Sequence, residues 1–168
     1  SPSFIQNHYF GFATDLPYYM PIDDYQDITI KPRFSQKKNP ALFIEHRKNF
    51  FNGEIVSEFS GTIENNKKEN GIKEDKKRGH IKTAGNFDLN KSSYIDFQVH
   101  RTADRHYLNT YKYGYRDTLT SFLKLNTHRN SNFYSLVSYL FLDLRQDVNR
   151  RIIAKIFPRF TLKINSEK

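Results

Sequence analysis

The sequence has no cysteine, no tryptophan, a single methionine and no long apolar run. Without cysteine, neither a disulfide framework nor a thiolate metal site is available. The longest uninterrupted apolar runs have the length of Tyr139-Leu140-Phe141-Leu142, far below the roughly 18 to 20 residues of a membrane-spanning helix. These absences exclude a helical membrane protein. A transmembrane sheet remains possible, because only every second residue then faces lipid and overall hydropathy stays low.

Basic and aromatic residues are abundant instead. The net charge is +9 and the mean hydropathy is -0.77, yet the chain contains 15 Phe and 11 Tyr. A soluble core would be richer in Leu, Val, Ile and Ala. The positive charge suits an anionic partner such as nucleic acid, anionic lipid head groups or a phosphorylated glycolipid, and it equally suits a solvated surface without a dedicated partner.

Apolar and polar residues alternate with a period of two along much of the chain. The stretch from Ile28 to Ser35 places Ile and Phe on one face and Thr, Lys and Arg on the other, as a strand with one apolar side requires. The same pattern returns from Lys155 to Ile164 over about ten residues, close to the length of a tilted spanning strand. Further strands are predicted at residues 42–49, 54–63, 81–89, 94–102 and 119–126.

Turn residues separate these stretches. Lys38-Asn39-Pro40, Asn52-Gly53, Asn90-Lys91-Ser92 and Asn130-Ser131-Asn132 each lie between two strand-like segments and indicate hairpins. The sequence therefore predicts an all-β, antiparallel up-and-down meander of about seven to nine strands. It forms one unit over residues 1–168, a segment of a transmembrane β-barrel that is an open, curved sheet when alone. Residues 64–79, where charges of both signs are interspersed, are expected to form a charged, solvent-exposed loop.

No motif points to catalysis or metal binding. The six histidines lack the spacing of a zinc site, and no phosphate-binding loop, nucleophile elbow or paired carboxylates can be recognised. We therefore expect no catalytic residue, no metal site, no cofactor and no enzymatic activity. A nucleic-acid platform is not expected either, because the aromatic motifs of the RNA-recognition type are missing.

Three stretches carry a resemblance. They are Gly11-Phe12 with Leu16-Pro17-Tyr18-Tyr19, then Asp27 to Phe34 (DITIKPRF), then Arg101 to Leu108 (RTADRHYL). In their order and spacing they resemble the barrel of the lipopolysaccharide-assembly outer-membrane protein family (LptD, the organic-solvent-tolerance proteins). The resemblance covers nearly the whole chain and identifies it as the N-terminal part of that barrel.

The resemblance implies a non-enzymatic role in the last step of lipopolysaccharide export, at the outer membrane of a Gram-negative bacterium. The implied partners are lipopolysaccharide, an outer-membrane lipoprotein plug of the LptE type, the periplasmic bridge proteins and outer-membrane lipids. The first and last strands of such a barrel form a lateral seam that parts to release the glycolipid.

The chain also departs from this family. The periplasmic jelly-roll domain, the later strands and the cysteines that join the two domains are not in this sequence, and Met20 stands where Trp is common. The N-terminus carries neither Met nor an apolar signal segment, so a fragment or a processed chain is expected.

Prolines and basic residues supply the candidate functional positions. Proline cannot donate to a strand ladder, so Pro17 and Pro32 are predicted to weaken the N-terminal edge as a lateral gate, the alternative being that they mark turns or protect an edge from aggregation. The basic residues expected to face the lumen, where they bind phosphate or only solvate the wall, are Lys31, Arg33, Lys155, Arg159 and Lys163.

The main alternative function is a soluble β-sandwich binding module with a basic face. Detergent dependence separates the two readings, since a barrel piece needs micelles and a sandwich is monomeric in buffer.

Overall fold

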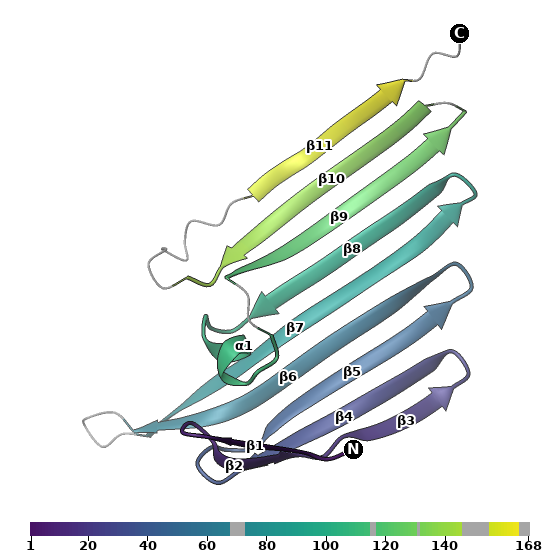
Figure 1. Ribbon diagram of the computed structural model, residues 1–168. Helices are drawn as coiled ribbons and strands as arrows, with labels where there is room; N and C mark the ends of the chain where they lie inside the picture. The colour runs from purple at the N-terminus through teal and green to yellow at the C-terminus, as the bar shows by residue number, and fades with distance from the viewer. Residues whose placement is uncertain (68–72, 115–116, 131, 146–154, 165–168) are drawn as a thin grey trace.

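The computed structural model describes residues 1–67, 73–114, 117–130, 132–145 and 155–164, and for residues 65–67, 73–74, 155–157 and 164 it describes the backbone alone. The described strands form one antiparallel sheet, and strands that follow one another along the chain mostly lie side by side (Figure 1). Eleven strands of the described residues belong to it, in the order β1-β2-β4 through β11, with β3 also paired to β4.

The strands are β1 (Ser3–Asn7), β2 (Gly11–Asp15), β3 (Tyr18–Asp23), β4 (Gln26–Ser35), β5 (Ala41–Phe50), β6 (Gly53–Lys67), β7 (Lys73–Asn90), β8 (Ser93–Thr102), β9 (Thr118–Arg129), β10 (Asn132–Asp143) and β11 (Lys155–Ile164). A single helical turn, α1 (Tyr107–Thr110), lies in the connection between β8 and β9.

The predicted fold class is confirmed: the sheet is antiparallel, up-and-down and open. All four predicted hairpins are present as pairs of consecutive strands. The strand number exceeds the expected seven to nine. Four strands, β1, β2, β3 and β10, have no predicted range. β1 and β2 have only five residues each, too few for alternation to stand out, and β10 was expected only as the strand after the turn at Asn130-Ser131-Asn132.

The charged loop expected at residues 64–79 is wrong for most of its length. β6 extends to Lys67 and β7 begins at Lys73, so the two strands stay paired through Glu64↔Lys76 up to Lys67↔Lys73. A ladder of backbone hydrogen bonds does not require apolar side chains, and the one cross-strand pair of opposite charge in this stretch, Glu64↔Lys76, stabilises it. Residues 68–72 of the expected loop lie outside the described residues.

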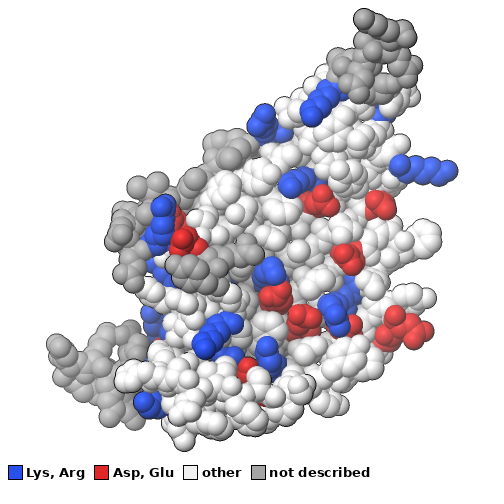
Figure 2. All heavy atoms as spheres, viewed as in Figure 1, with Lys and Arg blue, Asp and Glu red and all other residues white. Residues whose placement is uncertain are grey.

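The two faces of the sheet differ in charge. Cross-strand partners share a face, so one face follows from Asp15↔Arg33 through Glu58↔Lys82 to Asp96↔Lys124. This polar face is turned to the viewer in Figure 2, where basic and acidic side chains are interspersed. The opposite face, here called the apolar face, presents Phe34, Leu42, Phe59, Ile81, Leu123, Leu136 and Phe160, all more than a third exposed.

The two ends of the sheet also differ. Turns of about two residues join β3 to β4, β5 to β6, β7 to β8 and β9 to β10, and all of these lie at one end, the turn end. Gly53 is required there, because a Cβ at this position would lie 2.2 Å from the carbonyl oxygen of Asn86. The connection between β4 and β5 and the segment of residues 103–114 with α1 lie at the other end, the long-connection end (Figure 1). Within the described residues, no helix has the length and apolar character needed to cross a membrane.

Candidate functional site

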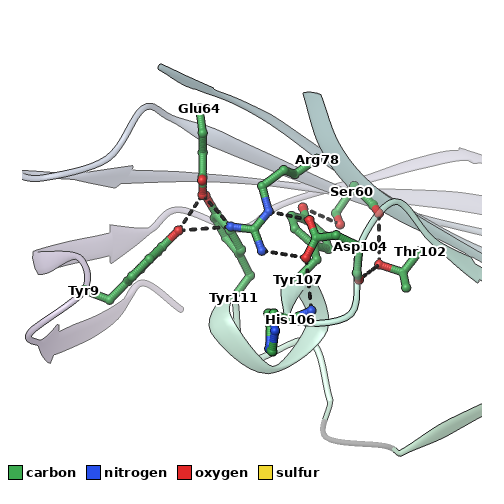
Figure 3. A network of polar contacts seen from close by, with 10 residues as sticks. Tyr9, Ser60, Glu64, Arg78, Thr102, Asp104, His106, Tyr107 and Tyr111 are labelled. Atoms are coloured by element: carbon green, nitrogen blue, oxygen red, sulfur yellow. Dashed lines mark hydrogen bonds and ion pairs between the residues drawn. The ribbon is translucent and has the colours of Figure 1, made fainter. Parts of the chain in front are cut away.

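Two segments cover the polar face at the long-connection end. One is the turn between β1 and β2, which carries Tyr9 and Phe10, and the other is the connection from Ala103 to Gly114 with α1 (Figure 3). Phe10, Tyr107 and Tyr111 are at most 1% exposed, so this cluster holds the largest buried side chains of the described chain. Aromatic rings and ion pairs of this cluster join parts of the sequence that are far apart.

Arg78 on β7 is the centre of the network in Figure 3. Its guanidinium donates to both carboxylate oxygens of Asp104, at 2.6 and 2.9 Å, and to Glu64 Oε1 at 2.8 Å. Tyr9 and Tyr111 also donate to Glu64 through their hydroxyl groups. The Arg78 side chain is 8% exposed, and because a buried ion pair stabilises only when its charges are fully matched, this set of partners accounts for its burial.

A second buried pair lies beside the first. Arg33 on β4 donates to both oxygens of Asp15 at 2.5 and 2.7 Å, and to the carbonyl oxygen of Tyr111 at 2.6 Å. Phe10 and Tyr113 place their rings within 5.4 Å of the same guanidinium. Arg33 therefore ties the N-terminal strands to the connection between β8 and β9.

Ser60 and His80 form a polar pair under α1. Ser60 Oγ lies 2.5 Å from His80 Nδ1 and 2.8 Å from the hydroxyl of Tyr107. The first distance is that of a nucleophile and its base. Tyr107 is fully buried and its hydroxyl shares the serine, so the pair supports α1 from the sheet.

Several ionisable side chains of the two covering segments have pKa values that differ from their ordinary ones. Burial and the hydrogen bond to Glu64 raise the pKa of Tyr9 to about 12, and the same two causes raise the pKa of Tyr111 further. Burial alone would raise the pKa of Asp104, but the hydrogen bonds and the charge of Arg78 outweigh it and lower this pKa below its usual range. The tyrosines stay neutral and the carboxylate stays ionised at neutral pH, which keeps the network intact.

The two gate prolines predicted from the sequence meet at one point of the N-terminal edge. Pro17 lies in the break between β2 and β3, and Pro32 lies in β4 opposite that break, where Leu16 N donates to Pro32 O at 3.0 Å. The N–H and C=O of a strand residue point to the same neighbour, so the N–H that Pro32 lacks would face Leu16 and not β5. The ladder is therefore interrupted on the edge side only.

The predicted lumen-facing residues have different surroundings. Arg33 lies on the polar face but is 4% exposed and engaged by Asp15, so it is not available to a phosphate. Lys31 lies on the same face over the ring of Phe43. Arg159 and Lys163, whose cross-strand partners are Val137 and Phe133, are exposed on it. The side chain of Lys155 lies outside the described residues.

Sequence reasoning missed Glu64 and Arg78 because both fell in the expected loop. Their signal was the position of a carboxylate and a guanidinium on facing strands, which becomes visible only once the β6–β7 register is known. Among the described residues, no group of three or more His, Asp or Glu side chains could hold a metal ion. No protein-family model and no curated protein matches the chain.

Proposed function

We propose that the chain is a segment of an outer-membrane β-barrel that takes part in the non-enzymatic export of lipopolysaccharide to the outer leaflet. Its apolar face meets lipid, its polar face lines the lumen, and its N-terminal edge belongs to the lateral gate. The partners proposed with this function are lipopolysaccharide, a lipoprotein plug and the periplasmic bridge proteins.

The observation that carries the membrane placement is a belt poor in charge on the apolar face. The outward positions from Ile55 to Ile63 on β6, from Gly79 to Phe87 on β7 and from Tyr134 to Leu142 on β10 contain no charged residue. β8 places one charge on this face, Arg101, which lies opposite Ile81 towards the long-connection end. A run of about nine residues rises roughly 30 Å along a strand. At a tilt of about 45° it covers roughly 20 Å of membrane depth, close to the ~25 Å apolar band of barrels.

Charges and aromatic rings border this belt. Lys48 and Arg129 lie on the apolar face towards the turn end, and Lys77 lies on it towards the long-connection end. A row of stacked or tilted rings, Phe50, Phe87 and Phe97, lies near the turn end. Aromatic residues at the borders of an apolar band are a feature of outer-membrane barrels. Short turns at one end and longer connections at the other fit the same class, with the turns facing the periplasm.

The residues of the family resemblance support the transport part of the proposal. Pro32 and Leu16 share a backbone hydrogen bond, and Ala13 belongs to the same buried cluster as Tyr107 and Leu108. The three stretches that resemble the family are thus joined in one structural unit, although up to about 80 residues of sequence separate them. A common functional unit explains why these stretches occur together.

The lateral gate is tested by restoring the backbone N–H groups that Pro17 and Pro32 lack. Pro32→Ala gives β4 an N–H that faces the carbonyl of Leu16, and Pro17→Ala lets the chain continue from β2 into β3. Each added hydrogen bond contributes about 0.5 to 1.5 kcal/mol in water and more where lipid offers no other partner. In cells that depend on the chain for export, the double variant should slow the arrival of newly made lipopolysaccharide at the surface. The control is Pro158→Ala in β11, and export that is unchanged in the double variant would contradict the gate.

The alternative, a soluble binding module, is distinguished from this proposal by whether the chain stays monomeric in buffer without detergent. One continuous sheet with an exposed apolar face supports the membrane reading, because monomeric soluble proteins rarely expose apolar patches larger than a few hundred Å². A chain that stays monomeric without detergent, with an intact β spectrum, would favour the soluble module.

A further inference from the structure

A groove lies on the apolar face where β4, β5 and β6 approach the long-connection end. It has a volume of about 740 Å³, within the range of ligand-binding sites. On the apolar face it is lined by Pro32, Phe34, Leu42, Ile63 and Lys77, around the bare backbone of Gly61. Asn39 and Pro40 also border it, and Thr62 and Arg78 line it from strands whose side chains at these positions lie on the polar face. The groove lies on the opposite side of the sheet from the Arg78 network.

The hollow exists because position 61 has no side chain. A Cβ on Gly61 would approach the carbonyl oxygen of Arg78 to 3.7 Å, an ordinary contact, and the backbone there does not need a left-handed conformation. Its cross-strand partner Gly79 is different, because a Cβ at that position would lie 2.4 Å from the carbonyl oxygen of Ser60. Gly79 is thus required by packing, whereas Gly61 is not, and its effect is to keep the groove open.

Lys77 gives the groove a charged end. It is the cross-strand partner of Ile63 and the first charged residue beyond the belt on β7. Its side chain is exposed, and no ion pair to it occurs among the described side chains. The one acidic residue of β7 on the same face, Asp75, lies further towards the connection. An apolar slot that ends in a lysine at the border of the belt matches a hydrocarbon chain that ends in an anionic head group.

We propose that this groove holds one acyl chain of a phosphorylated membrane lipid, with the phosphate of its head group bound by Lys77. The inference rests on the proposed membrane placement of the apolar face. It adds a lipid site on the outer wall of the barrel, beside the gate residue Pro32. A lipid held there would keep the slot filled next to the N-terminal edge.

The absence of tryptophan makes a direct test possible. Phe34→Trp places a single tryptophan, which can be excited selectively over the tyrosines, at the rim of the groove, and Leu123→Trp places one on the apolar face of β9, away from it. Both variants of the 168-residue chain are inserted into phosphatidylcholine vesicles that contain increasing fractions of phosphatidylglycerol or phosphatidylcholine with brominated chains. Quenching gives the relative affinity of each lipid at each position.

We expect brominated phosphatidylglycerol to be preferred about fivefold at the Phe34→Trp reporter, which corresponds to ~1 kcal/mol for one lysine near an anionic surface. No preference is expected at the Leu123→Trp reporter. Lys77→Gln should abolish the preference, while Lys48→Gln, which removes a lysine from the turn end of the same face, should leave it. Gly61→Leu should reduce quenching by either lipid at the groove reporter alone.

The other outcomes separate the two proposals. Equal quenching by both lipids at both reporters would overturn the lipid site and leave the membrane placement standing. A preference that survives Lys77→Gln and Gly61→Leu would also overturn the site. Quenching at neither reporter, with the β spectrum intact, would overturn the membrane placement and the site together.

Discussion

An arginine in the middle of the belt on the apolar face should cost far more stability than one at its border. Leu123 lies on the apolar face near the middle of β9, between Phe97 and Ser138 on the adjacent strands, and is 50% exposed. In a bilayer, Leu123→Arg should cost about 2 to 4 kcal/mol of unfolding free energy. That equals roughly a 30- to 700-fold change in the folding equilibrium, at 1.4 kcal/mol for each factor of ten. In water, a half-exposed position should tolerate the same change within about 0.5 kcal/mol.

The matched control is Leu162→Arg on β11. Leu162 is 44% exposed on the same face, so the change of residue and the exposure are nearly equal, but it lies close to the turn end. Near the membrane border this substitution should cost about 0 to 1 kcal/mol. The measurement is reversible urea unfolding from vesicles, followed by far-ultraviolet circular dichroism. Equal, small costs at the two positions would refute the lipid-facing assignment.

Two further predictions concern the Arg78 network. Arg78→Met leaves Glu64 and Asp104 without their cation and should cost about 3 to 5 kcal/mol in urea unfolding, and adding Glu64→Gln and Asp104→Asn should recover most of that loss. If the triple variant is no more stable than the single one, the loss came from packing and not from uncompensated charge. The second prediction concerns acid: because the pKa of Asp104 is lower in the folded chain, its contribution to stability is complete above the ordinary value of about 3.9 and is lost as pH falls through the folded pKa. Asp104→Asn should therefore weaken the fall of stability below pH ~4, and an unchanged pH profile would count against the proposed role of this carboxylate.

The local pattern was enough to predict the hairpins and the two faces. Turn residues such as Asn52-Gly53 and Asn90-Lys91-Ser92 mark the tight connections, and alternation from Ile28 to Ser35 assigns Arg33 to the polar face. These features depend on neighbours in sequence, or on one adjacent strand. They are therefore visible without knowledge of tertiary contacts.

The candidate site could not be predicted in the same way. Arg33 and Arg78 are buried because Asp15, Asp104 and Tyr111 come from other parts of the chain, and nothing local to either arginine signals this. Hydropathy instead assigned Glu64 and Arg78 to a solvated loop. The groove at Gly61 was missed for a related reason. A glycine opens a groove only where its neighbours on the same face of the sheet surround the space, and these neighbours come from adjacent strands.

The contacts of Arg33 and Arg78 also set an order of assembly. β2 pairs directly with β4, from Ala13↔Ser35 to Asp15↔Arg33, and this ladder needs no residue beyond β4. The buried contacts of Tyr9 with Glu64 and of Arg33 with Tyr111 need later parts of the chain. Closing so long a loop is slow compared with forming a hairpin. The N-terminal strands can therefore pair early, but their buried side chains reach their final packing only after residues 104–111 have joined them.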